Sequence, residues 1–370
     1  MRLVLDSEQE QLRSSVRDLL TDHAPSAAVR AAMEGDEGYD RALWRRLAGD
    51  LGAAGLVVGE RHGGAGAGHV ERAVVQQELG RVPAPVPYLA SAVLAVDAVQ
   101  ALGDESVSAE LLPGLATGER IGAVAAAGAD GTWGGAATSV TAEHRGGGWS
   151  LTGRVAPVLA GDLADVLLVF AGTTGGARWF VVDGGAEGLA RTALVGLDPT
   201  RRMARLDFAG TPARAVDGAG STGVLERVRD LAVVALAAEQ LGVVERVLAD
   251  TTDYATARVQ FGRAIGSYQA VKHRLADVLC TREQATALVR YAAWTADHDP
   301  DRLAEAAALA QVHLAPACFQ AAADGVQLKG GIGYTWEDDA HLLYKRAKSA
   351  EVLFGTPGQA RDRLADRLGF

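Results

Sequence analysis

The chain has 370 residues, of which 48% are hydrophobic and 22% charged, with a mean hydropathy near zero. This length and composition fit a globular protein of roughly two to three domains with a sizeable core. Lys and Arg number 36 against 46 Asp and Glu, and the net charge of −10 disfavours nucleic acid or an anionic membrane as the main partner.

Cysteine content and hydropathy indicate which covalent links, metal sites and cellular location to expect. The two cysteines, Cys280 and Cys318, have no second Cys or His at ligand spacing, so neither a disulfide framework nor a metal site is expected. The N-terminal segment lacks the apolar core of a secretory signal, and no run approaches the roughly 18 apolar residues of a membrane span. We therefore expect a cytoplasmic protein without a membrane span.

Residues 1–118 have the pattern of a helical domain. Asp6 and Ser7 mark a helix start, and Leu12, Val16 and Leu20 recur at helical spacing behind them. The pattern continues, with interruptions at glycine and proline clusters, to about residue 115.

Residues 119–216 change in character, because glycines become dense and short β-rich runs replace helical ones. Residues 139–144 and 149–152 flank a glycine-rich turn at 145–148, which is a hairpin signal. Further strands are expected at 164–170, 179–182 and 204–208. These runs predict a small middle β domain.

Residues 217–370 return to helical periodicity. Long apolar patterns at 231–254, 270–294, 303–326 and 338–354 predict a four-helix bundle. The fold class is therefore α+β and multidomain, in the order helical domain, β domain, helical bundle.

Two segments of the bundle combine polar donors with glycines. Residues 258–269 bring together Arg258, Gln260, Phe261 and Gln269, which offer a guanidinium, two amides and a flat ring within a short stretch. Such groups suit a nucleotide cofactor, because Arg binds phosphate oxygens with a planar fork and an aromatic ring covers a base. The alternative is a helix end with a solvated Arg and a core Phe.

The second segment lies between the third and fourth bundle helices. Gln327 offers an amide, and Gly330 and Gly331 permit positive φ and a close approach to a ligand. The alternative is a simple helix C-cap and turn.

Acidic residues leave two further alternatives. Glu337, Asp338 and Asp339 fit the start of a helix, where carboxylates bind free N–H groups, or else a metal or acid–base cluster. Glu239 lies in an apolar run, so it could be a partly buried base or, as we prefer, a carboxylate paired with an Arg.

Taken together, the two segments and the domain order resemble the flavin-dependent acyl-CoA dehydrogenase family over essentially the whole chain. The resemblance is carried by residues 254–269 and by Gln327 with the glycines at 330–333. It implies binding of FAD and oxidation of an acyl-CoA or acyl-carrier thioester to a trans-2-enoyl thioester. Electrons would then pass to an electron-transferring flavoprotein.

The resemblance assigns the cofactor contacts residue by residue. In the family the Arg-x-x-Phe-Gly segment of one subunit grips the ADP part of FAD that a neighbour mainly binds, and the Gln-x-x-Gly-Gly segment assists. This implies cofactor contacts at seven positions: Arg258, Gln260, Phe261, Gln269, Gln327, Gly330 and Gly331.

The catalytic base of the family is missing at both of its usual positions. Phe354 stands where a Glu usually precedes Gly-Thr, and Ala232 stands at the alternative position on the long helix. Neither side chain can accept a proton. In the β domain, Ala127 and the pair Pro157 and Leu159 stand near positions where family members carry the Thr and Trp groups that hold the flavin ring.

Three functions remain open on these residues. The first is the non-catalytic subunit of a heterotetramer with a homologous Glu-bearing catalytic subunit, with FAD shared across the interface. The second is a self-sufficient homo-oligomeric dehydrogenase with Glu239 as base. The third is a non-enzymatic scaffold or acyl-thioester binding protein.

Overall fold

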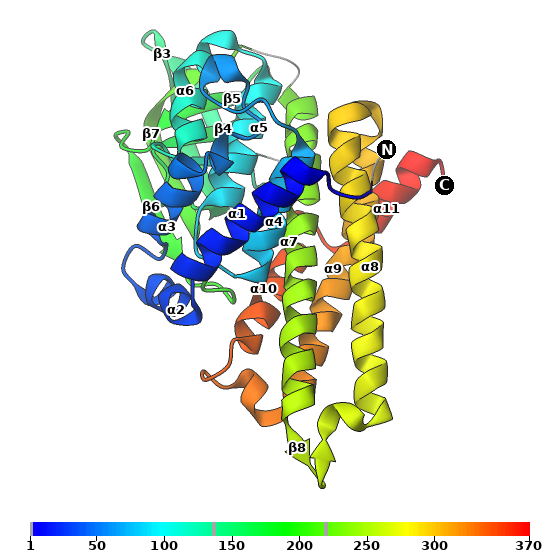
Figure 1. Cartoon of the computed structure of the whole chain (residues 1–370). Coiled ribbons are helices and arrows are strands. Elements are labelled where there is room, and N and C mark those ends of the chain that lie inside the picture. The colour runs from blue at the N-terminus through cyan, green and yellow to red at the C-terminus, as the bar shows by residue number, and fades with distance from the viewer. Residues whose placement is uncertain (1–2, 135–137, 218–220) are drawn as a thin grey trace. The chain divides into compact units, whose positions relative to one another are not determined.

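The computed structural model describes residues 3–134, 138–217 and 221–370 (Figure 1). Its helices are α1 Ser7–His23, α2 Ser26–Glu34, α3 Arg41–Arg45, α4 His69–Arg81, α5 Val96–Leu102, α6 Glu105–Thr117, α7 Ser221–Ala257, α8 Gln269–His298, α9 Leu303–Lys329, α10 Ala340–Val352 and α11 Pro357–Leu368. Its strands are β1 Gly122–Ala125, β2 Val140–Arg145, β3 Gly148–Leu159, β4 Val166–Thr173, β5 Gly176–Asp183, β6 Leu189–Leu194, β7 Met203–Ala215, β8 Val259–Gln260 and β9 Arg263–Ala264. Shorter helical turns include η4 Leu89–Ala95, η5 Ile265–Ser267 and η7 Gly330–Tyr334.

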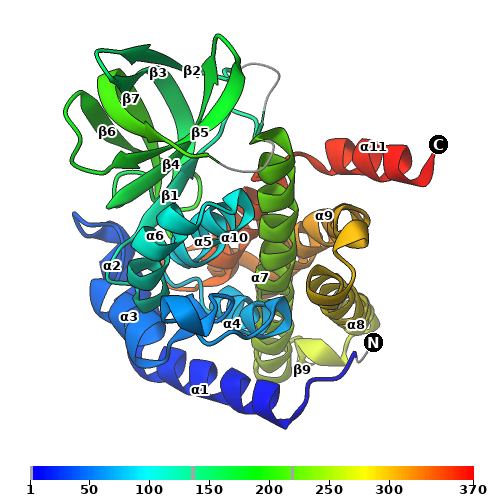
Figure 2. The ribbon, with the colours of Figure 1, turned by 90° about the horizontal axis from the view of Figure 1, so that it is seen from above.

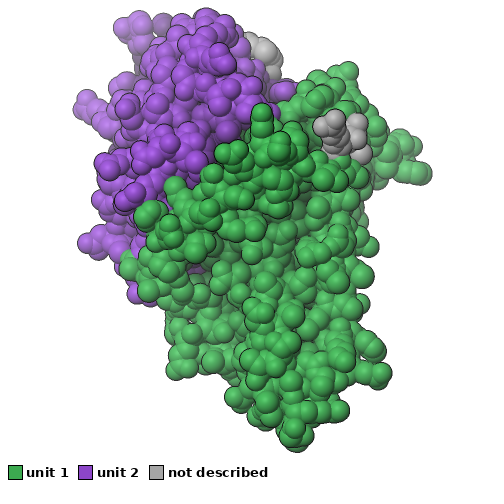
Figure 3. Space-filling model, viewed as in Figure 1, with its two compact units in different colours: residues 1–31, 69–84, 233–370 green, residues 32–68, 85–232 purple. Residues whose placement is uncertain are grey.

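The chain forms two compact units (Figure 3). One comprises residues 1–31, 69–84 and 233–370, and the other comprises residues 32–68 and 85–232. The domain boundaries expected at 118 and 216 mark the changes between helices and strands along the chain, and they stay a prediction.

In the first unit, glycines bring α4 and α7 into close approach. A Cβ at Gly80 would lie 1.9 Å from the carbonyl oxygen of Glu239, and one at Gly242 would lie 1.8 Å from that of Gln77. Only a residue without a side chain allows backbones to approach so closely. The crossing of these two helices is therefore fixed by a glycine on each of them.

The long helices α7, α8 and α9 of this unit run side by side, and α10 and α11 pack against α9 (Figure 1). A small core of valines, alanines, Leu343 and Cys318 lies between α7, α8, α9 and α10. The short hairpin of β8 and β9 joins α7 to α8 at one end of the bundle.

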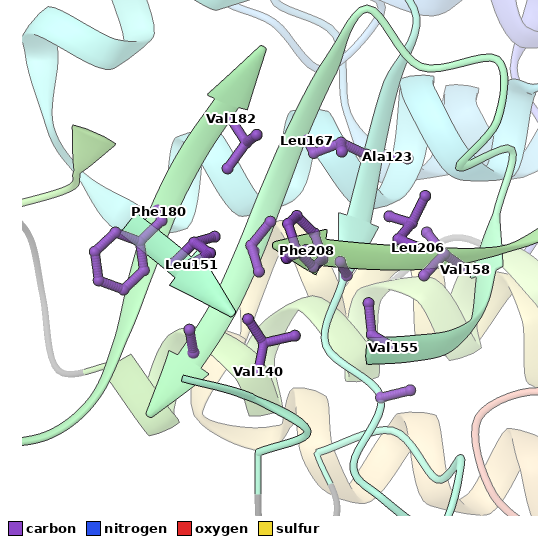
Figure 4. Packing of buried hydrophobic residues seen from close by; sticks show 14 of the residues in the cluster. Ala123, Val140, Leu151, Val155, Val158, Leu167, Phe180, Val182, Leu206 and Phe208 are labelled. Carbon is purple, nitrogen blue, oxygen red and sulfur yellow. The ribbon is translucent and has the colours of Figure 1, made fainter. Parts of the chain in front are cut away.

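In the second unit, the strands curl around a common apolar interior (Figure 2). Pairing runs β4–β2–β3–β7–β5 and returns from β5 to β4, so these strands close a ring, with β1 beside β4 and β6 beside β7. Leu151, Leu167, Phe180, Leu206 and Phe208 point into this interior (Figure 4). Alternation along each strand supplies the buried side chains.

The structure confirms the predicted fold class, and it adds elements that the sequence patterns did not indicate. The hairpin at 139–152 forms with Gly146 and Gly147 at its turn, both at positive φ, as β2 and β3 pair from Arg145 opposite Gly148. Strands β1 and β6 and helix α11 were not predicted. The four predicted bundle helices correspond to α7, α8, α9 and α10.

Candidate functional site

The turn at the end of the bundle is built around Phe261. Strands β8 and β9 pair Gln260 with Arg263, leaving Phe261 and Gly262 as a two-residue turn with φ of 53° and 78°. Positive φ at both positions is the requirement of a type I′ turn, but for a non-glycine residue it costs roughly 1–2 kcal/mol. The Phe261 ring is also 93% exposed. An aromatic side chain held in a strained turn and in solvent is typical of a binding residue rather than of packing.

The rest of the hairpin is braced internally. The guanidinium of Arg263 lies 4.0 Å from the centre of the Tyr268 ring, and the Tyr268 hydroxyl donates to the carbonyl oxygen of Gln260 at 3.2 Å. The backbone N–H of Ile265 donates to the carbonyl of Arg258 at 2.8 Å. The turn is therefore held in place while its tip stays open.

The polar residues predicted to bind the cofactor are exposed around this hairpin. Within the described residues, the Arg258 guanidinium and the Gln269 amide make no hydrogen bond or ion pair. In the described part of the chain, the Gln260 amide donates only to the neighbouring carbonyl of Val259, at 2.8 Å. This leaves a guanidinium and amides available to a ligand that approaches from outside the chain.

The glycine turn after α9 lies at the same end of the bundle (Figure 1). Gly330 has φ of 67° and ψ of −143°, a conformation that only glycine adopts readily. A Cβ at Gly330 or Gly331 would meet nothing within 4 Å, whereas one at Gly333 would lie 2.8 Å from the carbonyl oxygen of Val326. Gly333 is thus needed for packing, and the open backbone of Gly330 and Gly331 is available to a ligand beside the exposed Gln327.

The two positions where the family carries its base are buried and apolar. Ala232 is 0% exposed and Phe354 is 2% exposed. Neither side chain offers a group that could accept a proton.

Glu239 is held by Arg346. The Nε and Nη2 atoms of Arg346 each donate to one oxygen of the Glu239 carboxylate, both at 3.0 Å, and both side chains are buried. Glu239 is therefore paired with an Arg, which is the alternative that we preferred over a role as base. A carboxylate with both oxygens engaged by a guanidinium is a poor proton acceptor.

The acidic residues before α10 accept hydrogen bonds from a backbone N–H and from neighbouring side chains. Asp338 accepts the backbone N–H of Ala340 at 2.7 Å and pairs with Lys329, while Asp339 accepts from Ser26 and Arg30. Across residues 3–134, 138–217 and 221–370, no three His, Cys, Asp or Glu side chains gather as metal ligands would. Asp338 thus binds a free N–H at the start of α10, as one of the two alternatives from the sequence expected. Its ion pair with Lys329 was not indicated by the sequence.

Other buried titratable groups are structural. Burial lowers the pKa of Arg290, whose Nη2 donates to the Gln77 amide oxygen at 2.9 Å. Burial also raises the pKa of the Cys318 thiol, which lies in the bundle core.

No helix in the described part of the chain is both long and apolar enough to cross a membrane.

The residues present fit one part of FAD and not another. The guanidinium, amides, exposed ring and open glycines suit an anionic ligand that carries a flat base. In the second unit, three residues stand near the positions that hold the flavin ring in the family: the buried Ala127 and Leu159 and the exposed Pro157. None of the three has a polar side-chain group. The chain thus offers donors for the diphosphate and base of FAD, and no side-chain donor for the flavin ring at Ala127, Pro157 or Leu159.

Known proteins share the sequence and the fold of this chain. The family model "Acyl-CoA dehydrogenase, N-terminal domain" matches residues 6–119, and "Acyl-CoA dehydrogenase, C-terminal domain" matches residues 223–369. Acyl-CoA dehydrogenase IpdE2 of Mycobacterium tuberculosis is 38% identical over 98% of this chain and 97% of its own length. The chain belongs to the acyl-CoA dehydrogenase family. It is therefore a member of a family of flavin-dependent oxidoreductases.

Two solved structures of this acyl-CoA dehydrogenase family are similar along the full length. A chain of the ChsE4–ChsE5 complex from Mycobacterium tuberculosis is 31% identical, covering 100% of this chain and 99% of that one, with a TM-score of 0.91. A chain of the Tcur3481–Tcur3483 steroid ACAD is 32% identical, covering 98% of each chain, with a TM-score of 0.88.

Proposed function

We propose that this chain is the non-catalytic subunit of a heteromeric FAD-dependent acyl-CoA dehydrogenase. The observation that carries the proposal is the contrast between an exposed set of cofactor donors and the absence of a proton acceptor at Phe354 and Ala232. A homologous subunit would then supply the Glu base.

In this proposal, Arg258, Gln260, Phe261 and Gln269 bind the diphosphate and base of an FAD whose ring lies in the partner subunit. Gln327 and the open backbone of Gly330 and Gly331 complete that contact. FAD, when bound, supplies the hydride acceptor for desaturation of the acyl thioester. The role of this chain is to bind and orient the cofactor, and the α-proton goes to a carboxylate of the partner.

Partners follow from the same proposal. They are a coenzyme A or acyl-carrier thioester, the homologous catalytic subunit and an electron-transferring flavoprotein as electron acceptor. Two of the similar structures carry paired names, ChsE4–ChsE5 and Tcur3481–Tcur3483, and the latter is a steroid ACAD. On that likeness we extend the proposal to a bulky, steroid-derived acyl group as substrate class.

The test is to produce the chain with a homologue that carries the Glu base at one of its two usual positions, and to substitute one carboxylate at a time. Changing the partner's base Glu to Gln should abolish turnover, whereas Glu239→Gln in this chain should leave turnover per folded complex unchanged. Loss of turnover in Glu239→Gln, with folding intact, would instead support a self-sufficient enzyme. Failure of the chain to retain FAD with any partner would support the scaffold alternative.

A further inference from the structure

The glycine turn at residues 330–334 is closed at its base by an ion pair. Lys329 is the last residue of α9, and its Nζ lies 2.9 and 3.0 Å from the two carboxylate oxygens of Asp338, beyond the turn. The Lys329 side chain is only 8% exposed and that of Asp338 18%. A partly buried, hydrogen-bonded pair of this kind is worth more than a solvated surface pair.

Asp338 also connects the turn to the next helix. One of its oxygens accepts the backbone N–H of Ala340, the first residue of α10. The ion pair therefore joins the end of α9 to the start of α10 directly across the intervening loop. The loop cannot open without separating these charges.

A second tie comes from α2, and its residues belong to the same compact unit. The Nη2 of Arg30 donates to a carboxylate oxygen of Asp339 at 2.6 Å and to the carbonyl of Asp338 at 3.1 Å. The hydroxyl of Ser26 donates to the same oxygen of Asp339 at 2.7 Å. Arg30 and Lys345 also lie over the Trp336 ring, at 5.8 and 4.7 Å from its centre.

These ties matter because adjacent glycines allow the backbone of the turn many conformations. Gly330 and Gly331 are adjacent, exposed and without neighbours at the position of a Cβ, so side-chain packing does not restrict their backbone. The N–H of Gly330 bonds to the carbonyls of Gln327 and Val326, which ties the start of the turn to α9. A backbone that is to bind a ligand must be held near one geometry, and here the ion pair and the ties from the flanking residues add to the short-range backbone bonds of the turn.

We propose that Lys329, through its ion pair with Asp338, is a positioning residue that sets the conformation of the Gly330–Gly331 backbone for cofactor binding. The inference rests on the proposed role of this turn in FAD binding. Lys329 itself does not contact the cofactor in this proposal, since its ammonium is committed to Asp338 and nearly buried.

Two variants and two controls test the proposal in the complex of this chain with its Glu-bearing partner. Lys329→Met removes the charge at similar length, and Asp338→Asn removes the opposite charge while keeping an acceptor for Ala340. Lys329→Arg keeps the pair. Lys348→Met is the matched control, because Lys348 also forms an ion pair, with Glu351 at 2.6 Å on α10, away from the turn.

The first readout is amide hydrogen exchange of residues 330–337 in this chain, which needs no cofactor. Exchange should accelerate in Lys329→Met and Asp338→Asn and stay as in the unaltered protein in Lys329→Arg and Lys348→Met. The second readout is the FAD dissociation constant by flavin fluorescence, which should rise about tenfold in the first two variants only.

Unchanged exchange in Lys329→Met, or faster exchange with unchanged FAD affinity, would overturn the positioning role. These outcomes differ from a failure of the proposed function, in which even the unaltered chain retains no FAD with any partner.

Discussion

Glu239 on α7 and Arg346 on α10 form a two-point ion pair inside the bundle, with both donor–acceptor distances at 3.0 Å. Their side chains are 1% and 6% exposed. The pair occupies the acidic residue that otherwise would be the first candidate for a base in this chain. The pair therefore commits this carboxylate to the packing of the bundle.

Glu239→Gln should destabilise the fold rather than the chemistry. The substitution leaves the Arg346 guanidinium buried without its counter-charge, which costs about 2–4 kcal/mol in the free energy of unfolding. The double substitution Glu239→Gln with Arg346→Met should recover much of this loss. Urea unfolding measures both effects, and equal stability of Glu239→Gln and the unaltered chain would contradict the structural role of the pair.

Arg258→Ala should weaken FAD binding at least about tenfold, because the guanidinium can donate ionic hydrogen bonds to the cofactor. It should not lower the thermal midpoint, because within the described residues this guanidinium makes no hydrogen bond or ion pair. Arg361→Ala, on the exposed surface of α11, is the control and should leave both quantities unchanged. Flavin fluorescence titration and thermal unfolding separate the two. A fall in the midpoint with intact FAD affinity would assign Arg258 to the fold instead.

Phe261→Gly should move stability and binding in opposite directions. Glycine adopts the observed φ of 53° without strain, so the chain should gain about 1 kcal/mol, less the entropy that glycine adds to the unfolded state. Removal of the exposed ring should weaken FAD binding at the same time. Phe261→Ala separates the two effects, because it removes the ring and keeps the strained φ. Equal FAD affinity in the unaltered chain, Phe261→Gly and Phe261→Ala would show that the ring does not contact the cofactor.

Gly80→Ala should be strongly destabilising, by about 3 kcal/mol, because the added Cβ would lie 1.9 Å from the carbonyl oxygen of Glu239 and force α4 away from α7. Gly223→Ala on α7 makes a matched comparison, because a Cβ there meets nothing within 4 Å. That variant should gain about 0.5–1 kcal/mol from helix propensity. Denaturant unfolding would contradict the account if the two variants shifted stability in the same direction.

Acidification should destabilise the protein partly through His341, which packs edge-on against Trp336. Burial lowers the pKa of His341 below its ordinary 6.5, Lys345 and Arg30 act in the same direction, and two nearby carboxylates oppose them. The unfolded chain therefore binds this proton first, and stability falls as the pH drops below that ordinary value.

Replacing His341 by Phe removes the titration and keeps a ring beside Trp336. The variant should lose less stability than the unaltered chain between about pH 7.5 and about pH 5.5 in urea unfolding. Identical pH slopes for His341→Phe and the unaltered chain would remove His341 from the account.

Local patterns predicted much of the fold. The glycines at 146 and 147 indicated the β2–β3 hairpin because their freedom at positive φ is a property of the residue itself. Strand β6 was missed, since Ala-Arg-Thr-Ala has little β-propensity and five of its six residues are exposed. Helix α11 was missed because it is short and mostly polar, and its capping box of Thr356 and Gln359 is its clearest signal.

The candidate site was harder to read where it depends on tertiary structure. Residue types pointed to Arg258 and Phe261, yet nothing in the sequence predicts positive φ for a Phe. The pairing of Glu239 with Arg346 joins residues 107 apart, and such contacts are set by how helices pack. The Lys329–Asp338 pair spans only nine residues, but it forms because the intervening glycines fold the chain back.

The most direct test of the central claim is the flavin content of the purified complex, from absorbance near 450 nm and the subunit ratio by mass. We expect this chain alone to be colourless or nearly so. With a Glu-bearing homologue it should form a tetramer of two chains of each kind with about two FAD bound. A homotetramer of this chain alone, with about four FAD and full turnover, would contradict the account.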